Sequence, residues 1–249
     1  MTRGDQVVWL LVAAAVLVQI CYPLMSASLR NPVTMLSVVV FAAASIADAA
    51  RVHGPRGAAA LVVAAGGIGL AAETIGVSTG FPFGSYAYAD TLGPRVLDVP
   101  LIVPLAWTMM AWPALNVGRT LARSGWAVVA VAAVALASWD VFLDPQMVGA
   151  GHWRWLDPGQ GLPLVPGVPL TNYAGWLAVA ALVVAALYAL LGAAQVRTSK
   201  PAAVLYLWVY ASSVVAHVAF FGLPGSALLG GLVMGSVALP FARAVAKQR

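Results

Sequence analysis

The sequence has few charged residues, a single cysteine and three histidines. Charged residues make up 8% of the 249 positions and hydrophobic residues 62%, a balance that excludes a soluble globular domain. One cysteine, Cys21, excludes a disulfide within the chain and a cluster of cysteine ligands. The histidines His53, His152 and His217 lack the spacing of a metal site, and we expect no bound metal. The chain also has no P-loop and no Ser-His-Asp arrangement.

The sequence is instead rich in long apolar runs, each close to the roughly 20 residues that cross a bilayer. We expect an all-α integral membrane protein, a single domain over residues 1–249 that forms a bundle of eight transmembrane helices. Seven is the alternative, because the last run is glycine-rich and weaker. The predicted spans are 7–28, 33–50, 58–77, 100–121, 126–143, 172–196, 202–221 and 223–241.

The basic residues indicate how the bundle is oriented. They lie singly in short gaps between apolar runs, so the net charge of +5 does not indicate nucleic-acid binding. With the N-terminus inside, Arg30, Arg95 and Arg154 are outside. The inner side holds Arg3, Arg51, Arg56, Arg119, Arg123, Arg197, Lys200, Arg243, Lys247 and Arg249. The positive-inside rule therefore predicts a multi-pass protein of the cell membrane with both termini in the cytoplasm.

Two gaps, 78–99 and 144–171, are longer than the others and fall on the outer side. Both are rich in aromatic residues, prolines and glycines, which predicts two structured outer loops. The segment 99–101 and the segment 168–170 both read VPL, and a tryptophan follows each at the same interval. This pattern indicates an internal repeat of helix-loop-helix units, 58–121 and 126–196. The alternative is chance similarity in a chain rich in valine, proline and leucine.

The only glutamate, Glu73, lies inside a predicted span. Gly69, Gly76 and Gly80 share its helical face at spacings of three and four residues. Ionisable groups inside a membrane are costly and usually functional, and glycine allows another backbone or a flat ligand to approach closely. We therefore expect the glycines to form the wall of a lipid-facing groove with Glu73 as its acid. Simple helix packing around a paired carboxylate is the alternative.

Two aspartates are predicted at the depth of Glu73. Asp140 and Asp144 are one turn apart on one helical face, and their helix runs in the same direction as the helix of Glu73. A carboxyl group removed from water can keep its proton and act as a general acid. Glu73 is our candidate proton donor; Asp140 and Asp144 would supply counter-charge, position water or exchange that role with Glu73. A DxxxD motif also occurs in membrane prenyltransferases, but these need a second acidic motif and more basic residues.

Further polar and aromatic side chains complete the candidate site. Aromatic rings could stabilise a developing cation, although single aromatics at a membrane surface are commonly anchors. Tyr210 and His217 belong to a polar stripe on the seventh span that is expected to face the interior. The candidate substrate contacts are Gly69, Gly76, Gly80, Phe83, Tyr86, Trp107, Trp153, Trp155, Asn172, Trp176, Tyr210 and His217.

The order of these motifs resembles a known family. Between Glu73 and Trp176 the chain carries ExxG, GFPFGxYxY, LGP and PxxW, followed by DxxxDP, WxW and GVPLxNxxGW. The pattern resembles the membrane-bound carotenoid biosynthesis family, which includes carotenoid 1,2-hydratases of the bisanhydrobacterioruberin type. The resemblance implies addition of water to the terminal double bond of an acyclic (ψ) carotenoid end. It implies no cofactor, and it implies a carotenoid, membrane lipid and other carotenoid-pathway enzymes as partners.

Three other functions remain open at this point. A lycopene-type cyclase begins with the same protonation but excludes water, and sequence motifs alone do not separate it from a hydratase. A proton-coupled transporter of a lipid or small solute would also use acids inside the membrane. A non-catalytic subunit that presents carotenoid to a partner enzyme is the third alternative.

Overall fold

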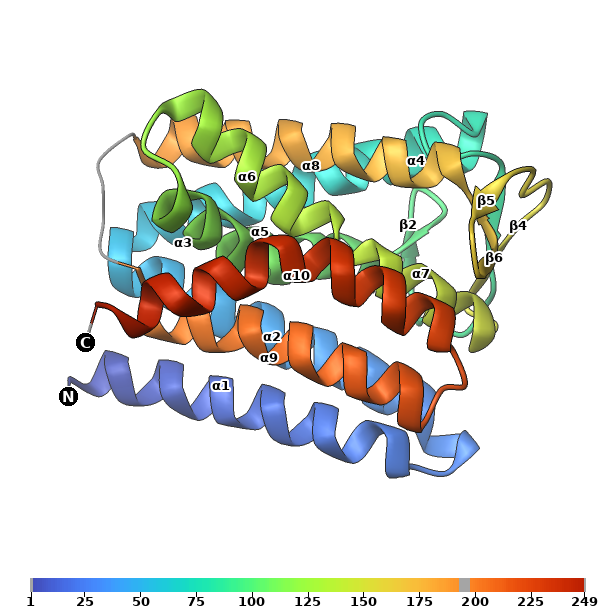
Figure 1. Cartoon of the computed structure of the whole chain (residues 1–249), viewed down its shortest axis with the longest axis horizontal. Helices are drawn as coiled ribbons and strands as arrows, with labels where there is room; N and C mark the ends of the chain where they lie inside the picture. The colour runs from blue at the N-terminus through green and yellow to red at the C-terminus, as the bar shows by residue number, and fades with distance from the viewer. Residues whose placement is uncertain (1, 193–197, 249) are drawn as a thin grey trace.

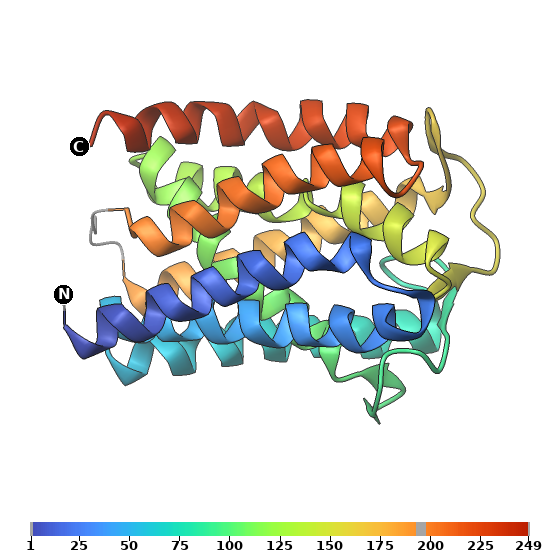
Figure 2. The same ribbon diagram turned by 90° about the horizontal axis from the view of Figure 1, so that it is seen from below.

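The computed structural model describes residues 2–192 and 198–248, and most of them are helical. The long helices lie side by side, with both chain termini at one end of the bundle and the short strands at the other (Figures 1 and 2). The helices are α1 (Arg3–Cys21), η1 (Tyr22–Leu24), α2 (Ala27–His53), α3 (Pro55–Leu61), η2 (Val62–Gly67), α4 (Ile68–Thr79), α5 (Ile102–Leu121), α6 (Gly125–Ala137), α7 (Asp140–Gly149), α8 (Leu170–Leu191), α9 (Lys200–Ala219) and α10 (Pro224–Ala246).

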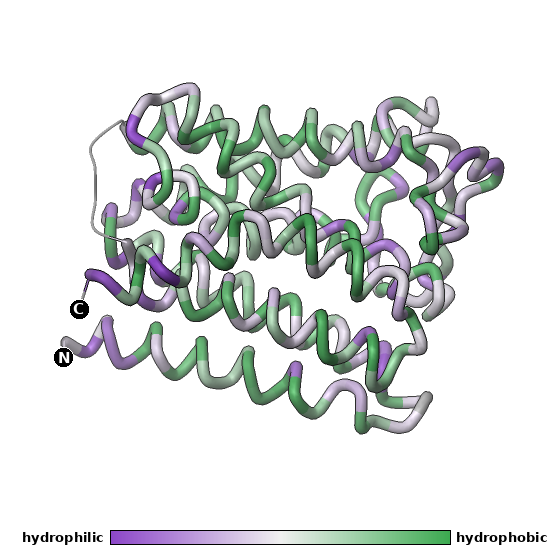
Figure 3. The backbone as a smooth tube through the Cα atoms, in the orientation of Figure 1, coloured by the Kyte–Doolittle hydropathy of each residue, from purple (hydrophilic) through white to green (hydrophobic). Residues whose placement is uncertain are grey.

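Several of these helices join end to end into rods of membrane length. Helices α3, η2 and α4 form one rod over Pro55–Thr79, and α6 and α7 form another over Gly125–Gly149. Within the described part of the chain, seven such rods and single helices are long and apolar enough to cross a membrane. Hydrophobic residues run along the helices, and hydrophilic residues gather near the two ends (Figure 3). The prediction of an all-α membrane bundle is confirmed.

One more long helix, α5, lies at the centre of the bundle. It packs against α2, α6, α8, α9 and α10, and nearly all of its residues from Trp107 to Arg119 are buried. Because protein surrounds this helix, it can carry Thr108, Asn116 and Arg119, which would be costly against lipid. This explains why α5 is not among the seven rods selected by hydropathy, although its length fits a span.

Several helix boundaries differ from those expected from the sequence. The predicted span 7–28 runs past the end of α1 at Cys21, and α2 begins at Ala27, before the predicted start at 33. The predicted span 126–143 is interrupted, because α6 ends at Ala137 and α7 begins at Asp140. The predicted span 172–196 corresponds to α8, which ends at Leu191 before Gly192. Residues 193–196 of that prediction lie outside the described part of the chain, as do the predicted inner charges Arg197 and Arg249.

The two outer loops are ordered and pair with each other. Strand β1 (Tyr86–Tyr88) pairs with β4 (Trp153–Trp155) in antiparallel register, which places Tyr86 opposite Trp155 and Tyr88 opposite Trp153. Each loop also forms a small hairpin before the next helix. These hairpins are β2 (Arg95–Val96) with β3 (Val99–Pro100), and β5 (Gly161–Leu162) with β6 (Val165–Pro169).

In both VPL segments the valine and proline end the last strand of such a hairpin, and the chain then enters a long helix, α5 or α8. The tryptophans that follow them, Trp107 and Trp176, stack with ring centroids 4.0 Å apart. These features agree with two related helix-loop-helix units. The internal repeat itself stays a prediction.

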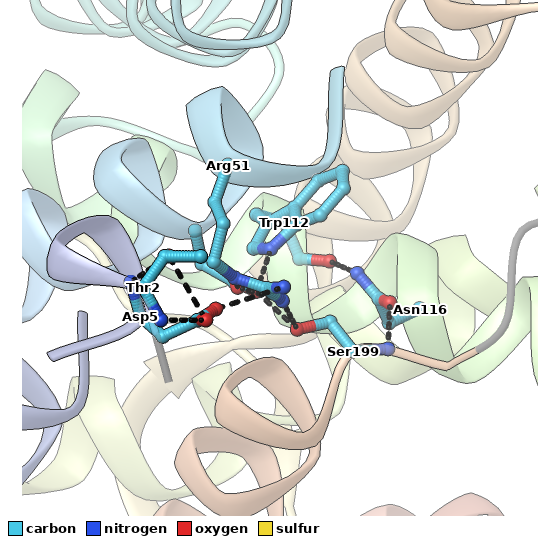
Figure 4. A network of polar contacts seen from close by, with 7 residues as sticks. Thr2, Asp5, Arg51, Trp112, Asn116 and Ser199 are labelled. Carbon is cyan, nitrogen blue, oxygen red and sulfur yellow. Dashed lines mark hydrogen bonds and ion pairs between the residues drawn. The ribbon is translucent and has the colours of Figure 1, made fainter. Parts of the chain in front are cut away.

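A polar cluster joins four helices at the end that holds the termini. The buried carboxylate of Asp48 accepts hydrogen bonds from the guanidinium of Arg51, from the indole of Trp112 at 2.8 Å and from the hydroxyl of Ser199. Arg51 also approaches Asp5 of α1 at 3.7 Å. Figure 4 shows Arg51 of α2, Trp112 of α5 and Ser199, the residue before α9, converging. With its partners satisfied, this cluster ties α1, α2, α5 and α9 together.

Candidate functional site

Three hydrogen-bond donors surround the carboxyl group of Glu73. The hydroxyls of Tyr86 and Tyr88 donate to Oε2 at 2.6 and 2.7 Å, and the Trp107 indole donates to Oε1 at 3.2 Å. Glu73 is 4% exposed. A buried carboxyl group with donors on both oxygens is therefore held in one orientation.

The glycines of α4 make room for these donors. A Cβ on Gly69 would lie 2.7 Å from the Trp107 ring, and a Cβ on Gly76 would lie 2.8 Å from the Tyr86 hydroxyl. Gly69 precedes Glu73 by four residues and Gly76 follows it by three, so the two positions flank Glu73 on one helical face. The space beside the glycines is thus occupied by the protein's own aromatic rings.

The paired loops supply the phenols. Tyr86 and Tyr88 are two residues apart on β1, and alternation along a strand directs both to the same side. Burial, together with the Glu73 carboxylate, raises the pKa of both tyrosines well above the ordinary value, so the phenols stay protonated and can donate. The Trp155 indole donates to the Phe83 carbonyl at 2.9 Å and holds the two loops together.

The two aspartates form a second centre. The side-chain amide of Asn172 donates to Oδ2 of Asp140 at 2.7 Å and to Oδ2 of Asp144. The Trp153 indole donates to the other oxygen of Asp144 at 3.0 Å. Oδ1 of Asp140 has no hydrogen-bond partner in the described residues. The expectation that Asp140 and Asp144 lie on one helical face is confirmed, since one amide reaches both.

Helices α9 and α10 hold the short helix α7 in place. Pro145 has no N–H, which leaves the Val141 carbonyl without its helical partner, and the Ser226 hydroxyl donates to that carbonyl at 2.6 Å. His217 has Nε2 2.9 Å from the Phe142 carbonyl and Nδ1 2.8 Å from the Ser213 carbonyl. His217 therefore contacts the backbone of α7, and neither of these hydrogen bonds reaches a carboxyl group.

Glu73 and Asp144 line one cavity. It holds about 1300 Å³ of space free of protein atoms, part of it open to the outside. Of the residues predicted from sequence, the cavity wall includes Glu73, Asp144, Phe83, Tyr86, Trp107, Trp153, Trp155, Asn172 and Trp176. An apolar cavity walled by aromatic rings, with carboxyl groups at its surface, is suited to protonating an apolar molecule and stabilising the resulting cation.

The other predicted residues lie elsewhere. Asp140 is behind Asp144 and fully buried. Gly69 and Gly76 pack against aromatic rings, and Gly80 ends α4 with a positive φ of 78°. Tyr210 donates to the Gly231 carbonyl on α10, and His217 contacts the Phe142 carbonyl of α7. None of these residues is part of the cavity wall.

Sequence reasoning did not select several residues of the site. Tyr88 could have been found from its period-two relation to Tyr86 once the loop was recognised as a strand. In the sequence, Thr34 and Ser37 share one helical face, and Ser213 belongs to the polar stripe of the seventh span. The sequence did not show that these residues meet in one wall, because they lie on α1, α2 and α9, far apart in the chain. This part of the wall comprises Gln19, Thr34, Ser37, Ser212 and Ser213.

Within residues 2–192 and 198–248, no group of three or more His, Cys, Asp or Glu side chains is arranged to hold a metal ion.

No solved structure matches the chain. A curated relative, bisanhydrobacterioruberin hydratase from Haloarcula japonica, is 34% identical over 111 residues, which cover 42% of this chain and 36% of the relative. The alignment thus spans about a third of that protein. The family model for carotenoid biosynthesis proteins matches residues 31–237, and with that match over most of its length the chain belongs to the carotenoid biosynthesis protein family.

Proposed function

We propose that this protein adds water to the terminal double bond of an acyclic carotenoid end. The observation that carries the proposal is the pair of carboxyl groups, Glu73 and Asp144, in the wall of one aromatic cavity within a membrane bundle. A carboxylic acid protonates the trisubstituted alkene, and water captures the tertiary cation. Addition of water transfers no electrons, so the reaction needs no redox cofactor. The relative named as a hydratase supports this reaction class.

The aromatic rings suit the cationic intermediate. Trp107 and Trp176 stack at 4.0 Å, and Trp139 meets Trp176 edge to face at 6.1 Å. All three rings are in the cavity wall together with Tyr86 and Trp155. Aromatic faces attract cations more strongly where water is depleted. They can therefore lower the energy of a carbocation without reacting with it.

The polar side of the cavity favours hydration over cyclisation. Ser37, Ser212 and Ser213 line the same cavity as the carboxyl groups, and Gln19 and Thr34 add further polar residues to its wall. Such groups can hold a water molecule close to the cation. A cyclase must keep water away until an internal alkene attacks, and an entirely apolar wall would serve it better.

Product analysis tests the proposal. The protein is expressed in a host that accumulates lycopene, and the carotenoids are compared by mass with those of the same host carrying an empty vector. A product heavier by one molecule of water is expected. An isomer of unchanged mass would indicate cyclisation. Unchanged lycopene would contradict the proposed hydration and favour a transporter or a non-catalytic subunit.

A further inference from the structure

The hydrogen bonds around the three carboxyl groups differ in a way that separates their roles. Glu73 receives two phenols on one oxygen and an indole on the other. An indole N–H can only donate. Three hydrogen bonds donated to one carboxyl group favour its charged form, and no second carboxyl group shares these donors, so the surroundings of Glu73 match a carboxylate.

The surroundings of the aspartate pair, in contrast, favour a bound proton. Asp140 and Asp144 share the amide of Asn172, and none of the ion pairs among the described residues includes either carboxyl group. Two like charges on one amide, without a cation, are strongly unfavourable in a buried setting. Such a pair is stable when it holds one proton. Oδ1 of Asp140 is buried and has no hydrogen-bond partner among the described residues, so no donor stabilises a negative charge on that oxygen.

Only one member of this pair can reach a substrate. Asp144 is in the cavity wall, whereas Asp140 lies behind it. Trp153 and Asn172 fix both oxygens of Asp144. Asp144 is thus placed to donate a proton into the cavity, and Asp140 to share that proton with it.

Resting on the proposed hydration, we propose that the Asp140–Asp144 pair is the acid, with Asp144 as the proton donor, and that Glu73 is the base. This reverses the role that the sequence indicates for Glu73. Asp140 and Asn172 are positioning residues in this scheme, because they act through Asp144.

The steps balance in atoms and charge. The π electrons of the terminal double bond take the proton of Asp144 and form a C–H bond. This leaves both aspartates charged beside a tertiary cation, whose positive charge compensates the second negative charge of the pair. A lone pair of water forms the C–O bond, and the water proton passes to the Glu73 carboxylate. The enzyme is restored when Glu73 releases its proton and the aspartate pair takes one from water.

Deuterium exchange separates the two halves of this reaction. Wild-type protein and the variants Glu73→Gln, Asp144→Asn and Asp140→Asn are incubated with lycopene in D2O, and carbon-bound deuterium is measured in product and recovered substrate. Wild type should form a hydrate with deuterium on carbon. Glu73→Gln should lose hydration on the order of 100-fold and still place deuterium in recovered lycopene, because the cation forms and loses a proton again. Both aspartate variants should lose hydration and exchange together.

The wild type tests the proposed hydration, and the variants test the assignment of acid and base. No hydrate from wild type would overturn the proposed function. A hydrate from wild type, with no exchange in Glu73→Gln or with exchange kept in Asp144→Asn, would overturn the assignment of roles. Asp157→Asn, an exposed loop change, is the matched control and should behave as wild type. Thermal unfolding checks the fold of each variant, and Asp140→Asn provides the same test if Asp144→Asn does not fold.

Discussion

At the scale of single residues, the site depends on which side chains donate hydrogen bonds to which carboxyl group. Glu73 has three donors, and Asp140 and Asp144 share one amide. In both arrangements the hydrogen-bond donors are neutral side chains. Neutral donors add no further charge, and each additional charge inside a membrane would be unfavourable. Small changes in these donors should therefore alter catalysis more than they alter folding.

Removing one phenol from Glu73 should test this directly. Tyr88→Phe deletes the hydrogen bond at 2.7 Å to Oε2, and hydrogen bonds to a charged group contribute about 1.5–3 kcal/mol. We expect hydration to slow roughly 10- to 100-fold, measured as hydrate formed per folded protein. Tyr210→Phe is the matched control, because its hydroxyl contacts the Gly231 carbonyl and lies outside the cavity wall. Equal effects of the two changes would contradict this account of Glu73.

At the scale of the helix, α4 brings the Glu73 backbone close to bulky neighbours. Two glycines one turn on either side of Glu73 receive Trp107 and Tyr86, whose polar atoms then reach the carboxyl group. The bare face interpreted from sequence as a ligand groove is thus filled by the protein itself. Glycine suits either use, because it leaves space without specifying what fills it.

A methyl group on this face should disturb the site. Gly76→Ala would place Cβ 2.8 Å from the Tyr86 hydroxyl and 2.9 Å from the Phe83 ring. Overpacking of this kind costs about 1–3 kcal/mol, so we expect a lower unfolding temperature and weaker hydration. In Gly67→Ala, the matched control, the new Cβ meets nothing within 4 Å. A fully active and equally stable Gly76→Ala would show that α4 can move away from β1 at little cost.

At the scale of the whole molecule, the two ends of the bundle have different tasks. The strand end carries the cavity and its carboxyl groups. The end with the termini carries Asp48 and Arg51, whose hydrogen bonds are made within the protein. Asp48 is a helix-end charge that pairs with Arg51, three residues on in the same helix, at 2.7 Å.

This division predicts that stability and catalysis can be changed separately. Asp48→Asn should destabilise the fold by about 2–3 kcal/mol, less than a fully buried pair would, because Arg51 is 30% exposed. Hydration per folded molecule should stay unchanged, as measured after thermal unfolding has defined the folded fraction. Asp90→Asn is the control, since its carboxylate pairs with Arg95 while 97% exposed, and it should change stability little. Loss of hydration in folded Asp48→Asn would instead couple the two ends.

The amino-acid sequence by itself determined the membrane bundle and the depth of its acids. Hydropathy and run length are local properties that set where helices lie, and the spacing of Asp140 and Asp144 places them on one face. The aromatic character of the two loops was equally visible. These features need no knowledge of which helices are neighbours.

Only the tertiary structure decided what each face meets. Helical periodicity does not set the rotation of one helix against another, so the sequence did not show that Trp107 fills the space at Gly69, or that His217 contacts the α7 backbone. The polar wall is the clearest case, because Gln19, Ser37 and Ser213 come from separate helices. Contacts between distant segments depend on packing of the whole bundle, and packing decided which carboxyl group is surrounded by donors and which is shared.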